Sequence, residues 1–199
     1  MNPQARFFGV PLPRTLLLLC ALFQQPCSAE KPVSFTHPGI LHSASELDFV
    51  RGKIASGEEP WASAWESLRS HRWASLDYTP MAHADVVRGR RGKNNMGMSE
   101  LMNDSAAAYT HALHWSMSGE QAHSDKAIEI LNDYARTLKS VEGHDARLLV
   151  GITGIHFVNA AELIAHGKAD WNSGDRARFS TMLRDCLLYT SDAADELCR

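Results

Sequence analysis

Cysteine is scarce in this chain. Only Cys20, Cys27, Cys186 and Cys198 occur among its 199 residues, so residues 28–185 contain none. That stretch therefore has no disulfide framework, no thiolate zinc site and no cysteine nucleophile. Its stability must come from an ordinary apolar core.

A strong charge of either sign is also lacking. The formal net charge is −3 and the sequence pI is near 6.3, which argues against a general nucleic-acid binder. The chain contains no G-x-S-x-G elbow, no phosphate loop and no H-E-x-x-H zinc helix. No set of potential ligands has a convincing metal-site spacing, so we predict neither a metal nor another cofactor.

The first 29 residues have the order of a secretory signal peptide. Arg6 and Arg14 precede the apolar run 16–23, and small residues lead to a cleavage point after Ala29. The run is far shorter than the roughly 20 residues of a membrane span. We predict a periplasmic or secreted protein with no stable membrane insertion after cleavage. A transmembrane anchor and a lipoprotein signal at Cys20 are the alternatives.

The last residues, 186–199, neither continue the preceding helical pattern nor resemble a helix cap. Back-translated, residues 186–195 resemble a transposon adapter used in preparing sequencing libraries. We therefore predict that 186–199 is an adapter artefact and that 30–185 is native sequence. A genuine short acidic tail is the alternative.

Apolar residues recur at helical intervals through the native part, which predicts an all-α fold. Ser43 and Glu46 have capping-box spacing, Pro60 suits a first helical turn, and Gly119 separates two helices that form an antiparallel hairpin. The fifth helix is apolar nearly all round and is expected to be buried on most sides. The predicted helices cover 44–56, a stretch from Pro60, 99–118, 120–140, 145–166, and a stretch beginning within 170–175.

Residues 71–98 lose this periodicity and are predicted to form a long polar loop. Loops of this length inside compact domains are usually functional or disordered. Arg90 lies among several cations and Asn95 follows them, a composition suited to gripping the carboxylates of an anionic chain. A solvated basic loop without a ligand is the alternative.

Two of the predicted helices carry polar side chains of the types found in catalytic and sugar-binding sites. On the third helix, Asp104, His111 and Trp115 share one face that could line a sugar cleft, whereas Tyr109 points away from it. On the fifth helix, the imidazole of His156 and the amide of Asn159 lie on or beside an apolar face and need partners. Structural roles within helix contacts are the alternative for all of them.

Three stretches together resemble the alginate lyase family of polysaccharide lyases. They comprise residues 35–41 with 46–50 and 59–61, then 97–100 with 103–115, 118–120 and 126–132, and finally 157–162. The resemblance implies an incomplete (α/α) toroid built from helical hairpins. It also implies cleavage of a uronate-containing polysaccharide by β-elimination, in which the substrate carboxylate is neutralised before the proton at C5 is abstracted.

The resemblance extends to the site. It implies catalytic roles for His111, His156 and Asn159, and substrate binding by Arg90, Asn95, Asp104, Tyr109 and Trp115. It also implies a downstream tyrosine, which we expect beyond Asp185, so that the 199-residue chain is expected to be inactive. The alternatives are a non-catalytic carbohydrate-binding protein and a toroid glycoside hydrolase using the carboxylates of Asp104 and Glu162.

Overall fold

The structure is a computed structural model, and it describes residues 34–188. The predicted signal peptide, 1–29, and the tail from residue 189 lie outside the described residues. The described part contains six α-helices and two short strands, which confirms the all-α prediction. The helices are α1 (Ala44–Ala55), α2 (Trp61–Arg69), α3 (Met98–Ser118), α4 (Gln121–Thr137), α5 (Ala146–His166) and α6 (Ser173–Met182).

The predicted start of the first helix and the predicted end of the third are borne out by local contacts. Ser43 Oγ accepts a hydrogen bond from the backbone N–H of Glu46 (3.2 Å), whose carboxylate accepts one from Ser43 N (2.9 Å), so α1 begins with a capping box. Gly119 ends α3 in the left-handed conformation, with φ of 74°. This turn folds α4 back along α3 as the predicted hairpin.

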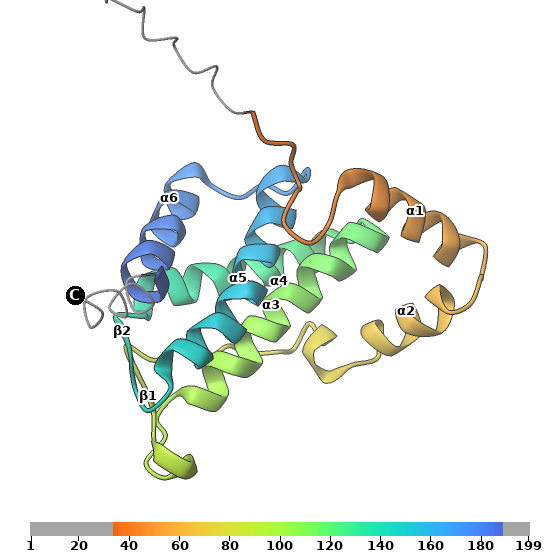
Figure 1. The fold of residues 1–199 in the computed structure, drawn as a ribbon. Helices are drawn as coiled ribbons and strands as arrows, with labels where there is room; N and C mark the ends of the chain where they lie inside the picture. The colour runs from red at the N-terminus through yellow and green to blue at the C-terminus, as the bar shows by residue number, and fades with distance from the viewer. Residues whose placement is uncertain (1–33, 189–199) are drawn as a thin grey trace, which may run out of the picture. The chain divides into compact units, whose positions relative to one another are not determined.

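Helices α3 and α5 lie side by side, α4 packs against α3, and α6 packs against α4 (Figure 1). The contacts among these four helices are apolar. Ile130, Leu131 and Tyr134 of α4 and Phe157 of α5 are all fully buried. Burial of each such side chain contributes on the order of 1.5–3 kcal/mol, so the four helices form one core.

The prediction of one long polar loop over 71–98 was wrong in part. This stretch contains the 3₁₀ turns η3 (Arg72–Ala74) and η4 (Arg90–Gly92) and the strand β1 (Asp85–Arg88). Strand β1 pairs in parallel with β2 (Ser140–Gly143), placing Val86 opposite Val141. Both valines are buried, so two four-residue strands tie the start of α3 to the start of α5.

The strands reveal a repeat that the sequence does not show. The order β1, α3, α4 is followed by the order β2, α5, α6. Because β1 pairs with β2, α3 with α5 and α4 with α6, the two units stack with equivalent elements adjacent. The described chain therefore contains two strand–helix–helix units.

Helix α5 is less buried than its composition suggests. By length and composition this helix could cross a membrane, but 44% of its most apolar 18-residue segment is buried inside the protein. Leu148, Ile152 and Ile155 are 55%, 41% and 40% exposed. The prediction of burial on most sides was wrong for this stripe, because α3 covers only one side of the helix.

Candidate functional site

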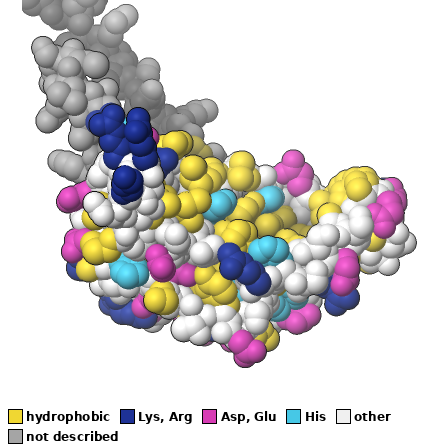
Figure 2. Space-filling view, turned by 90° about the horizontal axis from the view of Figure 1, so that it is seen from below, with side chains coloured by type: hydrophobic (Ala, Val, Ile, Leu, Met, Phe, Trp, Pro, Cys, Tyr) yellow, Lys and Arg dark blue, Asp and Glu magenta, His cyan; other side chains and the backbone are white. Residues whose placement is uncertain are grey.

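A cavity of about 410 Å³ opens between α3, α5 and the turn η3. In Figure 2, hydrophobic and histidine side chains gather in a hollow in the middle of one face of the molecule. The cavity combines two aromatic rings, an imidazole and an amide with apolar walls. Its lining residues are Trp73, Met102, Asn103, Ala106, Tyr109, Thr110, Ile152 and His156.

Tyr109 and His156 face each other across this cavity. Their ring centroids are 6.0 Å apart and their planes are inclined by 19°. The Tyr109 hydroxyl is hydrogen-bonded to Nε2 of His42, which precedes α1. Ser105 Oγ lies 3.4 Å from Nδ1 of His156, at the far limit of a hydrogen bond. The site thus joins a phenol and two imidazoles from three segments.

Partial burial shifts the pKa values of these groups in opposite directions. Desolvation lowers the pKa of His156 below the usual histidine value. The pKa of His42 is also lowered, mainly by desolvation, which outweighs the opposing charge of Glu46. Desolvation raises the pKa of Tyr109. At neutral pH the imidazole of His156 is therefore free to accept a proton, while the Tyr109 phenol keeps one to donate.

Hydrogen-bond donors adjoin the pair. Arg72 Nη2 donates to Oδ1 of Asn103 at 3.0 Å, which leaves the amide NH₂ of Asn103 available as a donor. The Arg72 guanidinium also lies 5.6 Å from the ring centroid of Trp73. The indole Nε1 of Trp73 is buried and has no acceptor among the described residues. A bound ligand rich in oxygen would supply acceptors for these groups.

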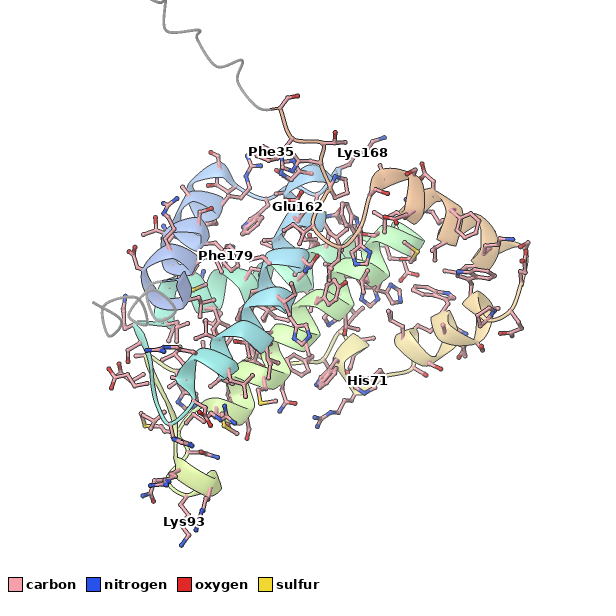
Figure 3. The ribbon with its side chains drawn as sticks, in the orientation of Figure 1. Phe35, His71, Lys93, Glu162, Lys168 and Phe179 are labelled. Carbon is pink, nitrogen blue, oxygen red and sulfur yellow. The ribbon has the colours of Figure 1, made fainter. Side chains whose placement is uncertain are left out.

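The predicted loop residues do not line this cavity. Arg90 and Asn95 are both exposed, and Asn95 Oδ1 accepts a hydrogen bond from the backbone N–H of Gly89 at 2.8 Å. In Figure 3, Lys93 stands at the tip of the projecting loop, well apart from His71 beside η3. Asn95 therefore shapes the loop, and Arg90 is an outlying cation.

Asp104 lies in the core rather than in a cleft. Its side chain is buried and accepts hydrogen bonds from Tyr78 Oη (2.5 Å), Tyr134 Oη (2.8 Å) and Met81 N (2.8 Å). These contacts join the loop before β1 to α3 and α4. The position argues against the predicted substrate contact and gives Asp104 a structural role.

Three further predicted residues also lie outside the cavity. His111 is fully buried and its Nδ1 lies 2.8 Å from Nδ1 of His123. Asn159 is 1% exposed, accepting from Leu41 N (3.2 Å) and donating to Ile155 O (2.7 Å). Neither residue lines the cavity. Trp115 lines a separate cavity of about 650 Å³ beside α1.

The larger cavity offers less chemistry. Two cations line it, Arg51 and Lys168, and Arg51 is already paired with the carboxylate of Asp48 at 2.6 Å. No tyrosine lines it, and His166 is its single histidine. The smaller cavity is therefore the better candidate, although it holds less space.

Sequence analysis missed four members of the candidate site: His42, Arg72, Trp73 and Asn103. Arg72 and Trp73 fall in the stretch predicted as a loop, where no periodicity assigns them a partner. Asn103 lies on α3 only one residue before Asp104, and His42 lies just before a capping box. Only its place beside Ser43 could have drawn attention to His42.

The comparison with known families agrees with the resemblance. The sequence profile of the alginate lyase family matches residues 48–198, a range that begins within α1 and takes in every later helix. Searches of curated proteins and of solved structures gave no significant match. Because the family match covers well over half of the chain, the chain belongs to the alginate lyase family.

Proposed function

We propose that this protein is an exported lyase that cleaves a uronate-containing polysaccharide, alginate or a related polymer, by β-elimination. Membership of the alginate lyase family supports a polysaccharide lyase in general. The observation that carries the finer proposal is the Tyr109–His156 pair, whose rings lie 6.0 Å apart in the cavity. Burial raises the pKa of Tyr109 and lowers that of His156, so one can act as the acid and the other as the base. The export signal proposed for residues 1–29 places the enzyme in the periplasm or outside the cell.

Each step of an elimination has a group to perform it within residues 34–188, so we place the base and the acid there and not, as the resemblance implied, beyond Asp185. Arg72 and the amide of Asn103 neutralise the substrate carboxylate, so that charge on the developing enolate is stabilised. His156 accepts the proton from C5. The electrons form the C4–C5 double bond, the bond from C4 to its glycosidic oxygen breaks, and Tyr109 donates its proton to that oxygen. His42, hydrogen-bonded to Tyr109, connects the phenol to solvent.

The proposed fold is an incomplete (α/α) toroid. In such a fold, inner helices contact inner neighbours and outer helices contact outer neighbours. The pairing of α3 with α5 and of α4 with α6 has this pattern. The exposed stripe at Leu148, Ile152 and Ile155 is an apolar face suited to a neighbouring helix or a sugar ring.

The rival activities are less well supported. A glycoside hydrolase needs two facing carboxylates. The carboxylate of Asp104 is buried and already accepts three hydrogen bonds. Glu162 accepts hydrogen bonds from Nδ1 of His37 (2.6 Å) and from Gly39 N (3.1 Å). A binding protein without turnover would use the same cavity, and activity alone separates it from a lyase.

One assay tests the proposal. The protein is incubated with alginate and other polyuronates, and ultraviolet absorbance of the unsaturated product is followed. We expect absorbance to rise with at least one polyuronate. New reducing ends without absorbance would indicate hydrolysis, and binding without either would indicate a binding protein.

The activity should depend on pH through His156. Only the neutral imidazole can accept the proton, and burial lowers its pKa below 6.5, so activity should persist into mildly acidic solution. Below the lowered pKa we expect kcat/KM to fall about tenfold per pH unit. The measurement is the pH profile of kcat/KM, and an acidic limb at or above pH 6.5 would contradict the assignment.

The cations of the exposed loop around η4 should attract an anionic substrate at long range. Arg90, Arg91 and Lys93 are exposed, and none of them forms an ion pair within residues 34–188. Replacing all three with glutamine should raise KM by about threefold to tenfold at low salt, with less effect at high salt and unchanged kcat. Kinetics at two ionic strengths check this. A fall in kcat would instead place the loop at the reacting sugar.

A further inference from the structure

We propose that His114, Glu120 and His123 form a binding site for a divalent transition metal, zinc by preference, at the α3–α4 turn. One potential ligand atom from each of these residues lies within 4.8 Å of the other two. This cluster is separate from the Tyr109–His156 cavity, and none of its members lines that cavity. Two imidazoles and a carboxylate are a common zinc ligand set, with water in the fourth position.

The two histidines are built into the protein interior. His114 and His123 are 6% and 5% exposed, whereas Glu120 lies at the surface. Nε2 of His123 lies 3.8 Å from Oε2 of Glu120. The rings of His114 and His123 are stacked with centroids 3.5 Å apart, and Trp65 of α2 packs on His114 at 4.7 Å. The cluster thus combines two buried, stacked imidazoles with one exposed carboxylate.

The hydrogen bonds around the cluster resemble those that orient metal-binding histidines. Such a histidine usually uses its second nitrogen to bond a neighbouring group. Nδ1 of His123 bonds Nδ1 of His111 (2.8 Å), and Nδ1 of His114 bonds Ser118 Oγ (3.2 Å). Both arrangements leave Nε2 as the ligand atom.

His111 sets the tautomer of its partner His123, because Nδ1 of each ring faces the other. In the empty cluster, the proton between the Nδ1 atoms of His111 and His123 can belong to either ring. A metal on Nε2 of His123 requires that proton on Nδ1 of His123, so His111 becomes the acceptor.

Binding requires a small closure. Two ligand atoms of a tetrahedral zinc lie about 3.4 Å apart, given bonds of about 2.1 Å. The ligand atoms lie within 4.8 Å of one another, with 3.8 Å between Nε2 of His123 and Oε2 of Glu120, and the stacked rings must turn so that both Nε2 lone pairs meet one ion. Glu120 follows Gly119 immediately and is exposed, so it can move toward the pair. The ion would clamp the hairpin, since its ligands come from α3, the turn and α4.

Sequence spacing alone did not predict this site. His114 and Glu120 are six residues apart and Glu120 and His123 are three apart. These intervals match no single-helix or hairpin zinc motif. The ligands converge only because the left-handed Gly119 reverses the chain between two packed helices.

The test is zinc titration of the untagged 199-residue chain after chelator treatment, followed by calorimetry. We expect one zinc ion per chain at this site. Glu120→Gln should weaken its binding at least tenfold, and H114Q/H123Q should abolish it. His111→Gln should weaken binding about tenfold to a hundredfold through loss of the partner of His123. Cobalt in place of zinc should give the visible absorption of a tetrahedral site.

A matched control comes from a second cluster. His37, Glu162 and His166 also lie within 4.8 Å of one another, but both histidines are exposed. His166→Ala should leave zinc binding unchanged. Zinc binding that survives Glu120→Gln undiminished, disappears in His166→Ala, or is absent from the folded chain would overturn the proposal. Because Glu120 is exposed, its variant reports on binding without disturbing the core.

Discussion

Replacing Asp104 with alanine is expected to lower the free energy of unfolding by about 3–5 kcal/mol. The carboxylate is 2% exposed and accepts three hydrogen bonds. Each bond to a charged acceptor contributes roughly 1.5–3 kcal/mol, and its removal leaves the buried hydroxyl of Tyr134 without a partner. Urea denaturation of the 199-residue chain measures the loss.

A milder variant serves as the control for this prediction. Tyr134→Phe removes one of the three hydrogen bonds and keeps the ring in the core, so it should cost about 1.5–3 kcal/mol. A loss below 1 kcal/mol for Asp104→Ala would show that the carboxylate does not join α3 to α4 and the loop. It would also reopen a role for Asp104 in substrate binding.

Replacing His156 with alanine is expected to lower kcat/KM of the proposed lyase about 10²–10⁴-fold, with most of the loss in kcat. His156 is the group assigned to the C5 proton, and no other imidazole lines its cavity. Tyr109→Phe should have a loss of the same order, because it removes the proton assigned to the leaving oxygen and leaves the ring in place. Steady-state kinetics with the preferred polyuronate measure both losses.

The matched control is His144→Ala. His144 is an exposed histidine just before α5, and its nearest charged partner is Asp145 at 3.1 Å. Its loss should leave kcat and KM unchanged. If His156→Ala raised KM and left kcat intact, His156 would bind substrate without taking part in proton transfer.

Much of the fold could be predicted because its signals are local. The capping box at Ser43 and Glu46, the stop at Gly119 and the apolar stripe of α4 each act within a few residues. The strands could not be predicted in this way. Val86 and Val141 are buried because they meet across 55 residues, and four residues carry too little periodicity to predict a strand.

The candidate site could be predicted from the sequence less well than the fold. Helical spacing places Asp104 and His111 on one face, but it does not say which neighbour covers that face. In the structure this side meets Tyr134 and His123 of α4, so both residues are buried. Tyr109 points away from it and therefore reaches the cavity. The site partners of Tyr109 come from η3, α5 and the residues before α1, and only tertiary packing brings those segments together.

The mass of the products tests the central claim most directly. Elimination adds no water, so the two products of each cleavage together weigh the same as the substrate, and one carries a C4–C5 double bond. We expect mass spectrometry of a defined uronate oligomer, cut by the protein, to show this balance of masses. Both products should be absent with the His156→Ala variant. Products that together exceed the substrate by one water would show hydrolysis and contradict the account.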